Sequence, residues 1–215
     1  MNITDQIIKR ITKNRISSTE VADCMDKTGL ISPRLAALNR GVYRVGKIKW
    51  TYAINESNWE HHRQIADIEP GQIVLTEPFN CGERAIFGDL VSKFLVLYKE
   101  SEALLILGKL RDVNHLIKEN YPIWLEGVTP IGCHNVKNEV DLDEETINQR
   151  REKYDGAIAV CDDSGVIMIP KELHNEEFLG KLDWIEEQED IWFECIDRRK
   201  WSTYETVCLK KYKED

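Results

Sequence analysis

The chain has 215 residues and carries 38 acidic against 29 basic residues, a formal net charge of −9 at pH 7. This length suits one domain with a sizeable core. The acidic balance argues against a nucleic-acid partner, because binding phosphates needs a surplus of Lys and Arg. An anionic small molecule would have to be met by a local positive site.

The cysteines and the N-terminus point to the compartment. Six cysteines are spread along the chain without a C-x-x-C pair, which predicts reduced, mostly buried thiols and no disulfide framework or zinc site. Residues 1–15 lack the continuous apolar segment of a signal peptide. No run reaches the roughly eighteen apolar residues that span a bilayer. We therefore expect a soluble, cytoplasmic protein that does not bind membranes.

Hydrophobic periodicity predicts helices at the start and alternating elements afterwards. Apolar residues at positions 3, 7, 8 and 11 have helical spacing. Ser17 followed by Glu20 forms a capping box that opens a second helix, which we expect to end near Gly29. Further along, the expected elements are a strand over 47–52, a helix over 59–66, a strand over 72–76, a loop over 79–84, a helix over 90–98, a strand over 103–107, a turn over 108–112, a helix over 113–119 and a strand over 122–125.

The last third of the chain predicts a charged helix and a hairpin. Residues 139–153 are charged and prone to form a helix. Two short apolar runs, 157–161 and 166–169, flank an Asp-Asp-Ser-Gly turn and are typical of a strand pair. Short strands interleaved with short helices predict one mixed α/β domain over residues 1–215.

One stretch of the chain combines residue types that bind an anion and a cation. A buried strand ends at a turn that presents Arg111 and Asp112 together. Upstream, Asp89 opens an amphipathic helix, so the amides of Leu90 and Val91 are first-turn donors suited to a carboxylate. A helix start, an arginine fork and a carboxylate together suit a 2-oxo acid and a hard cation.

Several short motifs stand in a characteristic order. They are Ser18-Thr19-Glu20-Val21-Ala22-Asp23, Glu69-Pro70-Gly71-Gln72-Ile73-Val74, Gly88-Asp89-Leu90, Gly108-x-x-Arg111-Asp112, Gly127-Val128-Thr129-Pro130 and Asp162-Asp163-Ser164-Gly165-Val166. Together they resemble the signature of the 4-hydroxy-4-methyl-2-oxoglutarate aldolase family, which shares its fold with the regulator of ribonuclease activity A (RraA). The resemblance covers about residues 16–172. The tail, residues 173–215, is expected to pack on this domain or on a neighbouring subunit.

The resemblance implies a fold, an assembly and a reaction. The fold would be a swivelling β/β/α domain, assembled as a homotrimer or as two stacked trimers (a hexamer), with each site near a subunit boundary. The reaction would be that of a divalent-metal-dependent lyase, by aldol cleavage or oxaloacetate-type decarboxylation of a 2-oxo acid. The metal, Mg²⁺ or Mn²⁺, would polarise the 2-keto group, so that no lysine Schiff base is required.

The resemblance also implies a role for each matching residue. Asp112 would hold the metal, with water filling most other positions. Arg111 would bind the oxo-acid end of the substrate and offset the charge of the enolate. The amides of Leu90 and Val91 would take the pyruvyl carboxylate, and Asp89 would act through a water as general acid/base.

Two alternatives stand beside the lyase. One is a non-catalytic, protein-binding regulator of a ribonuclease, a branch in which the resemblance implies loss of the aspartate after the arginine; Asp112 therefore favours the enzyme. The other is a specialised biosynthetic relative that acts on a different substrate. Leu107 and Lys109, which are expected to reshape the pocket, and His115, where aldolases often carry an acid, are consistent with it.

Two further departures concern spacing. Twenty-one residues separate Asp89 from Arg111, one more than the family pattern, and we expect the additional residue in the loop 99–102. The helix-like segment 139–153 stands where the family has a strand before the closing hairpin.

Other chemically active residues are expected to be structural. We predict that His61 and His62 are exposed and bind no metal, because adjacent positions on a helix face apart. Cys133 and His134 are not expected to form a nucleophilic pair, because adjacency alone does not orient them.

Overall fold

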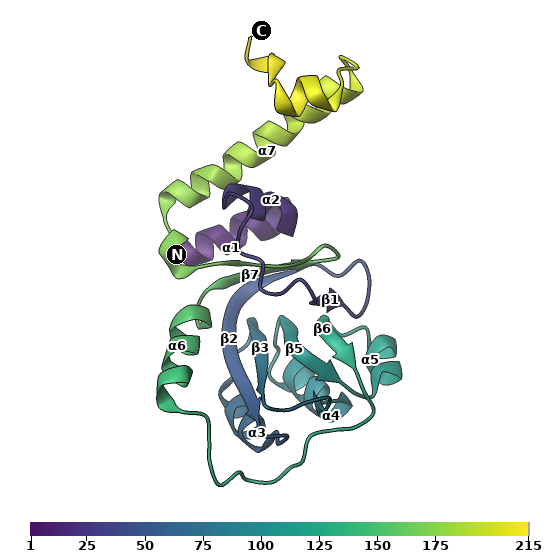
Figure 1. The fold of residues 1–215 in the computed structure, drawn as a ribbon. Helices are drawn as coiled ribbons and strands as arrows, with labels where there is room; N and C mark the ends of the chain where they lie inside the picture. The colour runs from purple at the N-terminus through teal and green to yellow at the C-terminus, as the bar shows by residue number, and fades with distance from the viewer. Residues whose placement is uncertain (215) are drawn as a thin grey trace.

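A mixed sheet organises residues 1–214, the part of the chain that the computed structural model describes (Figure 1). Its strands are paired in the order β1-β6-β5-β3-β2-β7-β8, with β4 paired to the end of β5. The strands are β1 (Ala36–Ala37), β2 (Arg44–Ile54), β3 (Gln72–Phe79), β4 (Ala85–Phe87), β5 (Ala103–Leu110), β6 (Ile123–Val128), β7 (Ile158–Asp162) and β8 (Gly165–Ile169).

The centre of the sheet is parallel and its margins are antiparallel. Strands β2, β3, β5 and β6 run in the same direction, whereas β7 pairs antiparallel with β2 and β1 pairs antiparallel with β6. Strands β7 and β8 form a hairpin in which Asp162 is opposite Gly165, which confirms the predicted strand pair and its turn. The central strands are buried on both faces, as parallel strands covered on both sides usually are.

Helices pack on both sides of this sheet. They are α1 (Ile3–Asn14), α2 (Ser18–Cys24), α3 (Trp59–Gln64), α4 (Asp89–Lys93), α5 (Val113–Glu119), α6 (Glu144–Tyr154) and α7 (Glu176–Asp197), with short 3₁₀ turns at Ile65–Asp67, Lys171–Leu173 and Lys211–Lys213 and π-helical turns at Phe94–Tyr98 and Tyr204–Cys208. Helices α3, α4 and α5 lie together on one face of the parallel strands (Figure 1).

Strand alternation separates the core into layers. On β2, Trp50 and Tyr52 point into a central core, whereas Ala53 points to the core under α3 and α4. On β7, Cys161 faces the central core and Val160 faces α1, α2 and α7. The hairpin thus forms a second β layer between the central core and the N-terminal helices. This is the swivelling β/β/α arrangement, and the mixed α/β prediction is confirmed.

The predicted start of the second helix is confirmed in detail. Ser17 accepts a hydrogen bond from the amide of Glu20 (3.2 Å), and the Glu20 carboxylate accepts one from the amide of Ser17 (2.7 Å). The helix ends at Cys24, earlier than the expected end near Gly29. The charged segment in the last third is a helix, α6, which Asp143 caps through the amide of Thr146.

Three elements differ from the expectation. β5 continues to Leu110, so the predicted turn over 108–112 is reduced to Arg111 and Asp112. The short strand β4 follows the predicted loop, at residues 85–87 for which no element was predicted; its three residues are buried and pair with β5. Downstream of α4, the amide of Lys99 donates to the carbonyl of Phe94, five residues back. A π-helical turn holds one residue more than an α-helical turn. The place of the additional residue in the loop 99–102 stays a prediction.

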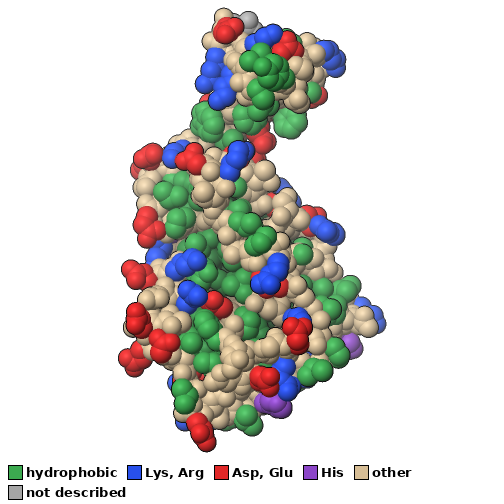
Figure 2. All heavy atoms as spheres, viewed as in Figure 1, with side chains coloured by type: hydrophobic (Ala, Val, Ile, Leu, Met, Phe, Trp, Pro, Cys, Tyr) green, Lys and Arg blue, Asp and Glu red, His purple; other side chains and the backbone are tan. Residues whose placement is uncertain are grey.

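The C-terminal tail is mostly one long helix. The first half of α7 packs on α1 and α2 through Phe178, Leu182 and Ile185. Its second half and the turns after it extend away from the sheet (Figure 1). Apolar side chains are exposed on this extension, as the space-filling view shows (Figure 2). Within residues 1–214, no helix is long and apolar enough to cross a membrane.

Candidate functional site

The candidate site lies where two strand-to-helix junctions meet. Strand β4 pairs parallel with the end of β5, with Phe87 opposite Leu110. The amide of Arg111 donates to the carbonyl of Phe87 (3.1 Å) and fixes the two junctions side by side. Because the carboxyl ends of parallel strands share one edge of a sheet, the first residues of α4 and α5 lie close together.

Asp112 is held against the start of α4. Its Oδ2 accepts a hydrogen bond from the backbone amide of Asp89 (3.2 Å). Asp112 adopts the left-handed backbone conformation (φ 61°) as the N-cap of α5. A Cβ at position 88 would lie only 2.1 Å from Asp112 Oδ2 and 2.8 Å from Cγ of Arg111, so Gly88 is needed for this approach.

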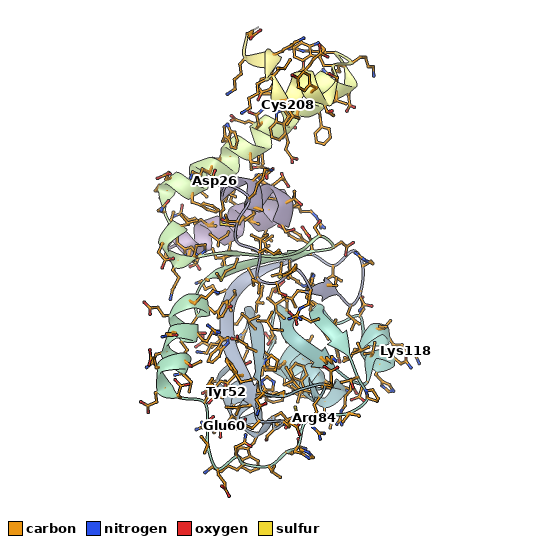
Figure 3. The ribbon with its side chains drawn as sticks, viewed as in Figure 1. Asp26, Tyr52, Glu60, Arg84, Lys118 and Cys208 are labelled. Carbon is orange, nitrogen blue, oxygen red and sulfur yellow. The ribbon has the colours of Figure 1, made fainter. Side chains whose placement is uncertain are left out.

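Arg111 lies beside the aspartate and over a second glycine. Its Nε is 3.6 Å from Oδ2 of Asp112. A Cβ at position 132 would lie 2.6 Å from its Nη1, so the guanidinium covers the backbone of Gly132. Arg84, labelled in Figure 3, donates to the carbonyl of Gly132 (3.0 Å) and holds this loop. The Arg111 side chain is 48% exposed and that of Asp112 46% exposed, so both are open to a ligand.

An open pocket of about 600 Å³ surrounds these groups. Its walls come from the starts of α4 and α5 and from the loop after β6, which the amide of Thr129 ties to the carbonyl of Leu110 (3.0 Å). The lining residues are Asp89, Leu90, Arg111, Asp112, Val113, Asn114, His115, Val128, Thr129 and Pro130. Val91 lines a smaller hollow of about 130 Å³ that shares four of these residues.

The start of α4 offers backbone donors to this pocket. The first bond of the helix runs from the amide of Ser92 to the carbonyl of Gly88 (3.1 Å). The amides of Leu90 and Val91 precede it and have no acceptor within the helix. Helix α4 continues into the π-helical turn, so its N-terminus carries the partial positive charge of a helix longer than α4 alone.

The donor set fits a hydrated hard cation. Within residues 1–214, no group of three His, Cys, Asp or Glu side chains is placed to hold a metal. Asp112 offers a half-exposed carboxylate at the pocket wall, and Mg²⁺ commonly binds one or two carboxylates while keeping several waters. Asp112 with water therefore suits Mg²⁺ or Mn²⁺ and does not suit a tetrahedral zinc site, which needs more protein ligands.

Two residues expected to reshape the pocket lie elsewhere. Leu107 and Lys109 line a separate hollow on the other side of β5, and Lys109 forms an ion pair with Glu83. The expectation is wrong because β5 is still a strand at these positions, so both residues lie before the turn that carries Arg111 and Asp112, and neither lines the main pocket. His115 does line the main pocket, one helical turn beyond Asp112, and is exposed.

The other candidate groups are structural, with one correction. His61 is fully buried, not exposed as expected, and its ring stacks on Phe87 with a centroid distance of 5.0 Å. Burial lowers the pKa of His61 to about 3, so its ring is neutral at pH 7. The neighbouring thiol of Cys81, together with burial, raises the pKa of Cys133. A protonated thiol is a poor nucleophile.

Sequence reasoning missed the residues of the smaller hollow. Asn58, His62 and Asn135 line it beside Gly88 and Asp112, although they come from the start of α3 and from the loop after β6. No motif or spacing in the sequence joins these segments. Their proximity comes from a backbone hydrogen bond between the amide of Asn58 and the carbonyl of His134 (3.0 Å).

Comparison with known proteins gives a consistent result. The profile of the RraA-like family, described as Aldolase/RraA, matches residues 18–168. A crystal structure of a protein from Pseudomonas syringae pv. tomato is similar, with a TM-score of 0.71 and 22% identity, over 95% of this chain and 98% of that one. Streptomyces coelicolor RraAS2, described as an unusual member of the RNase ES inhibitor RraA family, has a TM-score of 0.66 and 16% identity, over 86% of this chain and 94% of that one.

A third similar structure is that of the RNA-processing inhibitor RraA from Thermus thermophilis. It has a TM-score of 0.54 and 16% identity, over 71% of this chain and 92% of that one. At these identities the three structures support the shared fold and do not assign an activity.

Proposed function

The chain belongs to the RraA-like family, and we propose that it is a divalent-metal-dependent lyase that acts on a 2-oxo acid. The observation that carries the proposal is the contact between the Asp112 carboxylate and the start of α4, with Arg111 beside it. A carboxylate, a guanidinium and free helix amides at the wall of one pocket match the parts of a 2-oxo acid and a hard cation.

Each group has a task that its position supports. The amides of Leu90 and Val91 receive the carboxylate of the substrate, where the helix N-terminus favours negative charge. Arg111 donates to the oxo-acid end and offsets the negative charge that develops when the bond beyond C3 breaks. Asp112 holds Mg²⁺ or Mn²⁺, which when bound supplies a Lewis acid for the 2-keto group.

Asp89 moves the proton. Its amide is used by Asp112, but its side chain lines the pocket and is partly exposed. A carboxylate within one water of the reacting oxygen acts as general base for the 4-hydroxyl of an aldol and returns the proton to C3. In a decarboxylation the same group delivers the proton to C3 after carbon dioxide has left.

A ribonuclease regulator is the second candidate function. The structures of Streptomyces RraAS2 and Thermus RraA, which are named as a member of an inhibitor family and as an inhibitor, share the fold. The regulator does not require Asp112, Gly88 and the amides of α4 to converge on a pocket. This convergence favours the lyase, as does the aspartate that follows Arg111.

The pocket also lies among exposed apolar side chains, which supports an assembly. Leu90 is 84% exposed, Tyr98 73% and Val128 57%, all on elements that border the pocket or continue from its walls. Large apolar side chains so exposed and so close together are typical of subunit contacts. We expect a homotrimer or hexamer with each site near a subunit boundary.

The activity assay tests the proposal directly. Purified protein is incubated with oxaloacetate or with a 4-hydroxy-2-oxo acid, and pyruvate is measured with and without Mg²⁺ or Mn²⁺. We expect pyruvate release that depends on the metal and that EDTA stops. If no 2-oxo acid is cleaved while the protein binds and inhibits a ribonuclease, the regulator is the correct function.

A further inference from the structure

A chain of three hollows leads away from the proposed reaction site. The main pocket and the 130 Å³ hollow share Asp89, Leu90, Arg111 and Asp112, so they meet at these residues. The 130 Å³ hollow in turn shares two residues with a third hollow of about 380 Å³. We call the second and third hollows together the distal channel; its polar and aromatic walls are Asn58, Trp59, His62, Arg63 and Asn135.

The walls of the distal channel are fixed in place. Asn58 and His62 are four residues apart at the start of α3, so they face the same side. The side-chain amide of Asn58 donates to the carbonyl of Ile86 (2.8 Å). The loop that carries Asn135 is held by the amide of His134, which donates to the carbonyl of Glu56 (2.7 Å).

The distal channel offers hydrogen bonds without net charge. Asn58 is 6% exposed, and its Oδ1 has no hydrogen-bond partner in the part of the chain that the structure describes. A buried acceptor without a partner is unfavourable, and a ligand hydroxyl would satisfy it. Partial burial lowers the pKa of His62, so its ring is neutral at pH 7 and offers one donor and one acceptor.

Among the described residues that line the third hollow, the cation Arg63 is already neutralised. Arg63 Nε donates to the carboxylate of Glu60 (2.8 Å), which is buried at the position labelled in Figure 3. If the substrate carried a second carboxylate in the distal channel, no cation without a carboxylate partner would be there, among the residues that the structure describes, to bind it. Arg111, at the junction with the main pocket, is the other positive charge among the described lining residues. Trp59 is 44% exposed and offers an aromatic surface instead.

We propose that the distal channel binds the uncharged, polyhydroxylated end of a 4-hydroxy-2-oxo acid, with its hydroxyls on Asn58, His62 and Asn135 and its C–H face on Trp59. This inference rests on the proposed lyase function and names its substrate class. In the reaction the C3–C4 bond breaks, the 4-hydroxyl loses its proton, C3 gains one, and the products are pyruvate and a polyhydroxy aldehyde. No further reactant is needed, because the bond cleavage is redox-neutral.

The test compares two substrates of the same aldol cleavage that differ only beyond C4. Pyruvate release is measured with Mg²⁺ for a six-carbon 2-oxo-3-deoxy sugar acid and for 4-hydroxy-2-oxoglutarate, which has a second carboxylate in place of the hydroxylated chain. We expect kcat/KM to be at least about tenfold higher for the sugar acid, a ratio that a few hydrogen bonds and one stacking surface can supply.

Variants locate the preference in the channel. Trp59→Ala and Asn135→Ala change exposed side chains, and each is expected to lower the ratio of kcat/KM for the sugar acid over 4-hydroxy-2-oxoglutarate by about tenfold, mainly through KM. Trp184→Ala, at an exposed tryptophan of α7 remote from the channel, is the matched control and leaves the ratio unchanged. Thermal unfolding of each variant checks that it is folded.

The outcomes separate the two proposals. Turnover of 4-hydroxy-2-oxoglutarate at equal or higher kcat/KM than the sugar acid overturns the inference and leaves the lyase standing. The inference is also overturned if the protein prefers the sugar acid but neither Trp59→Ala nor Asn135→Ala reduces that preference. If no 2-oxo acid releases pyruvate, the lyase proposal fails and the inference fails with it.

Discussion

The backbone amide of Asp89 and the carboxylate of Asp112 are joined by a hydrogen bond of 3.2 Å across 23 residues of sequence. This bond joins the start of α4 to the start of α5, and it leaves the amides of Leu90 and Val91 as first-turn donors without an acceptor in the helix. The candidate metal ligand and the candidate carboxylate site are thereby held in one fixed relation. Any change that separates Asp89 from Asp112 should therefore affect both metal binding and the binding of the substrate carboxylate.

The first prediction concerns the glycine beneath this contact. In Gly88→Ala the new Cβ would lie 2.1 Å from Asp112 Oδ2, so the carboxylate has to move. We expect kcat/KM for pyruvate release to fall by about a hundredfold, because displacing a catalytic group by about 1 Å has an effect of that size. Steady-state kinetics at saturating Mg²⁺ measure it.

Gly180→Ala is the matched control for this substitution. Gly180 lies in α7, and no atom lies within 4 Å of its added Cβ. It should raise helix stability by up to about 1 kcal/mol and leave activity unaltered. If Gly88→Ala retains the activity of the parent, the close approach of α4 to Asp112 is not needed for the reaction.

The second prediction concerns the metal. Asp112→Asn retains the size and the left-handed backbone preference of the residue but removes the charge. We expect loss of metal-dependent pyruvate release and loss of Mg²⁺ binding by calorimetry. Asp112→Ala should abolish the activity as well. Because the side chain is half exposed, both variants should remain folded by circular dichroism.

An Asp112 variant that is as active as the parent would contradict the metal assignment. Glu83→Gln is the control, because Glu83 is a highly exposed carboxylate on the neighbouring loop and pairs with Lys109 outside the main pocket. It should bind Mg²⁺ and release pyruvate as the parent does.

The third prediction concerns the capping box at the start of α2. Ser17→Ala removes the acceptor for the Glu20 amide, and the free energy of unfolding should fall by about 1 kcal/mol. Urea unfolding at pH 7 measures the change. The candidate site is remote from Ser17, so the variant should keep the activity of the parent at low temperature. If the free energy of unfolding does not fall, water replaces the side-chain cap.

The elements that the sequence predicts well are those whose signals are local. The Ser17 and Glu20 capping box and the hairpin turn at residues 162–165 are decided by neighbouring residues, and the structure has both. The start of α4 is likewise recognisable, because an amphipathic pattern begins at Asp89, and so is the turn at Arg111, because it follows a buried strand.

The elements that sequence reasoning misses depend on distant contacts. β4 is three residues long, and only its pairing with β5 makes it a strand. His61 has the polar flanks of an exposed helix, yet the stacked ring of Phe87 buries it completely. The distal channel joins α3 to the loop of Asn135 through one backbone hydrogen bond, for which the sequence has no pattern.

The fourth prediction follows from the burial of His61. Its pKa is about 3 in the folded protein against 6.5 for an ordinary histidine, so between these pH values the unfolded chain binds more protons. The stability that the neutral ring allows is therefore present above pH 6.5 and is lost as the pH falls toward 3. From pH 7 to pH 5 the loss due to this group should be about 2 kcal/mol.

His61→Phe tests the fourth prediction, because a phenyl ring fits the stack on Phe87 and cannot be protonated. Both ring nitrogens of His61 lack partners among residues 1–214, so at pH 7 the variant should be as stable as the parent or more stable by about 1 kcal/mol. Urea unfolding at pH 7 and pH 5 should show that the variant loses about 2 kcal/mol less than the parent. The same acid sensitivity in both proteins would mean that His61 is protonated in the folded state or reaches water there.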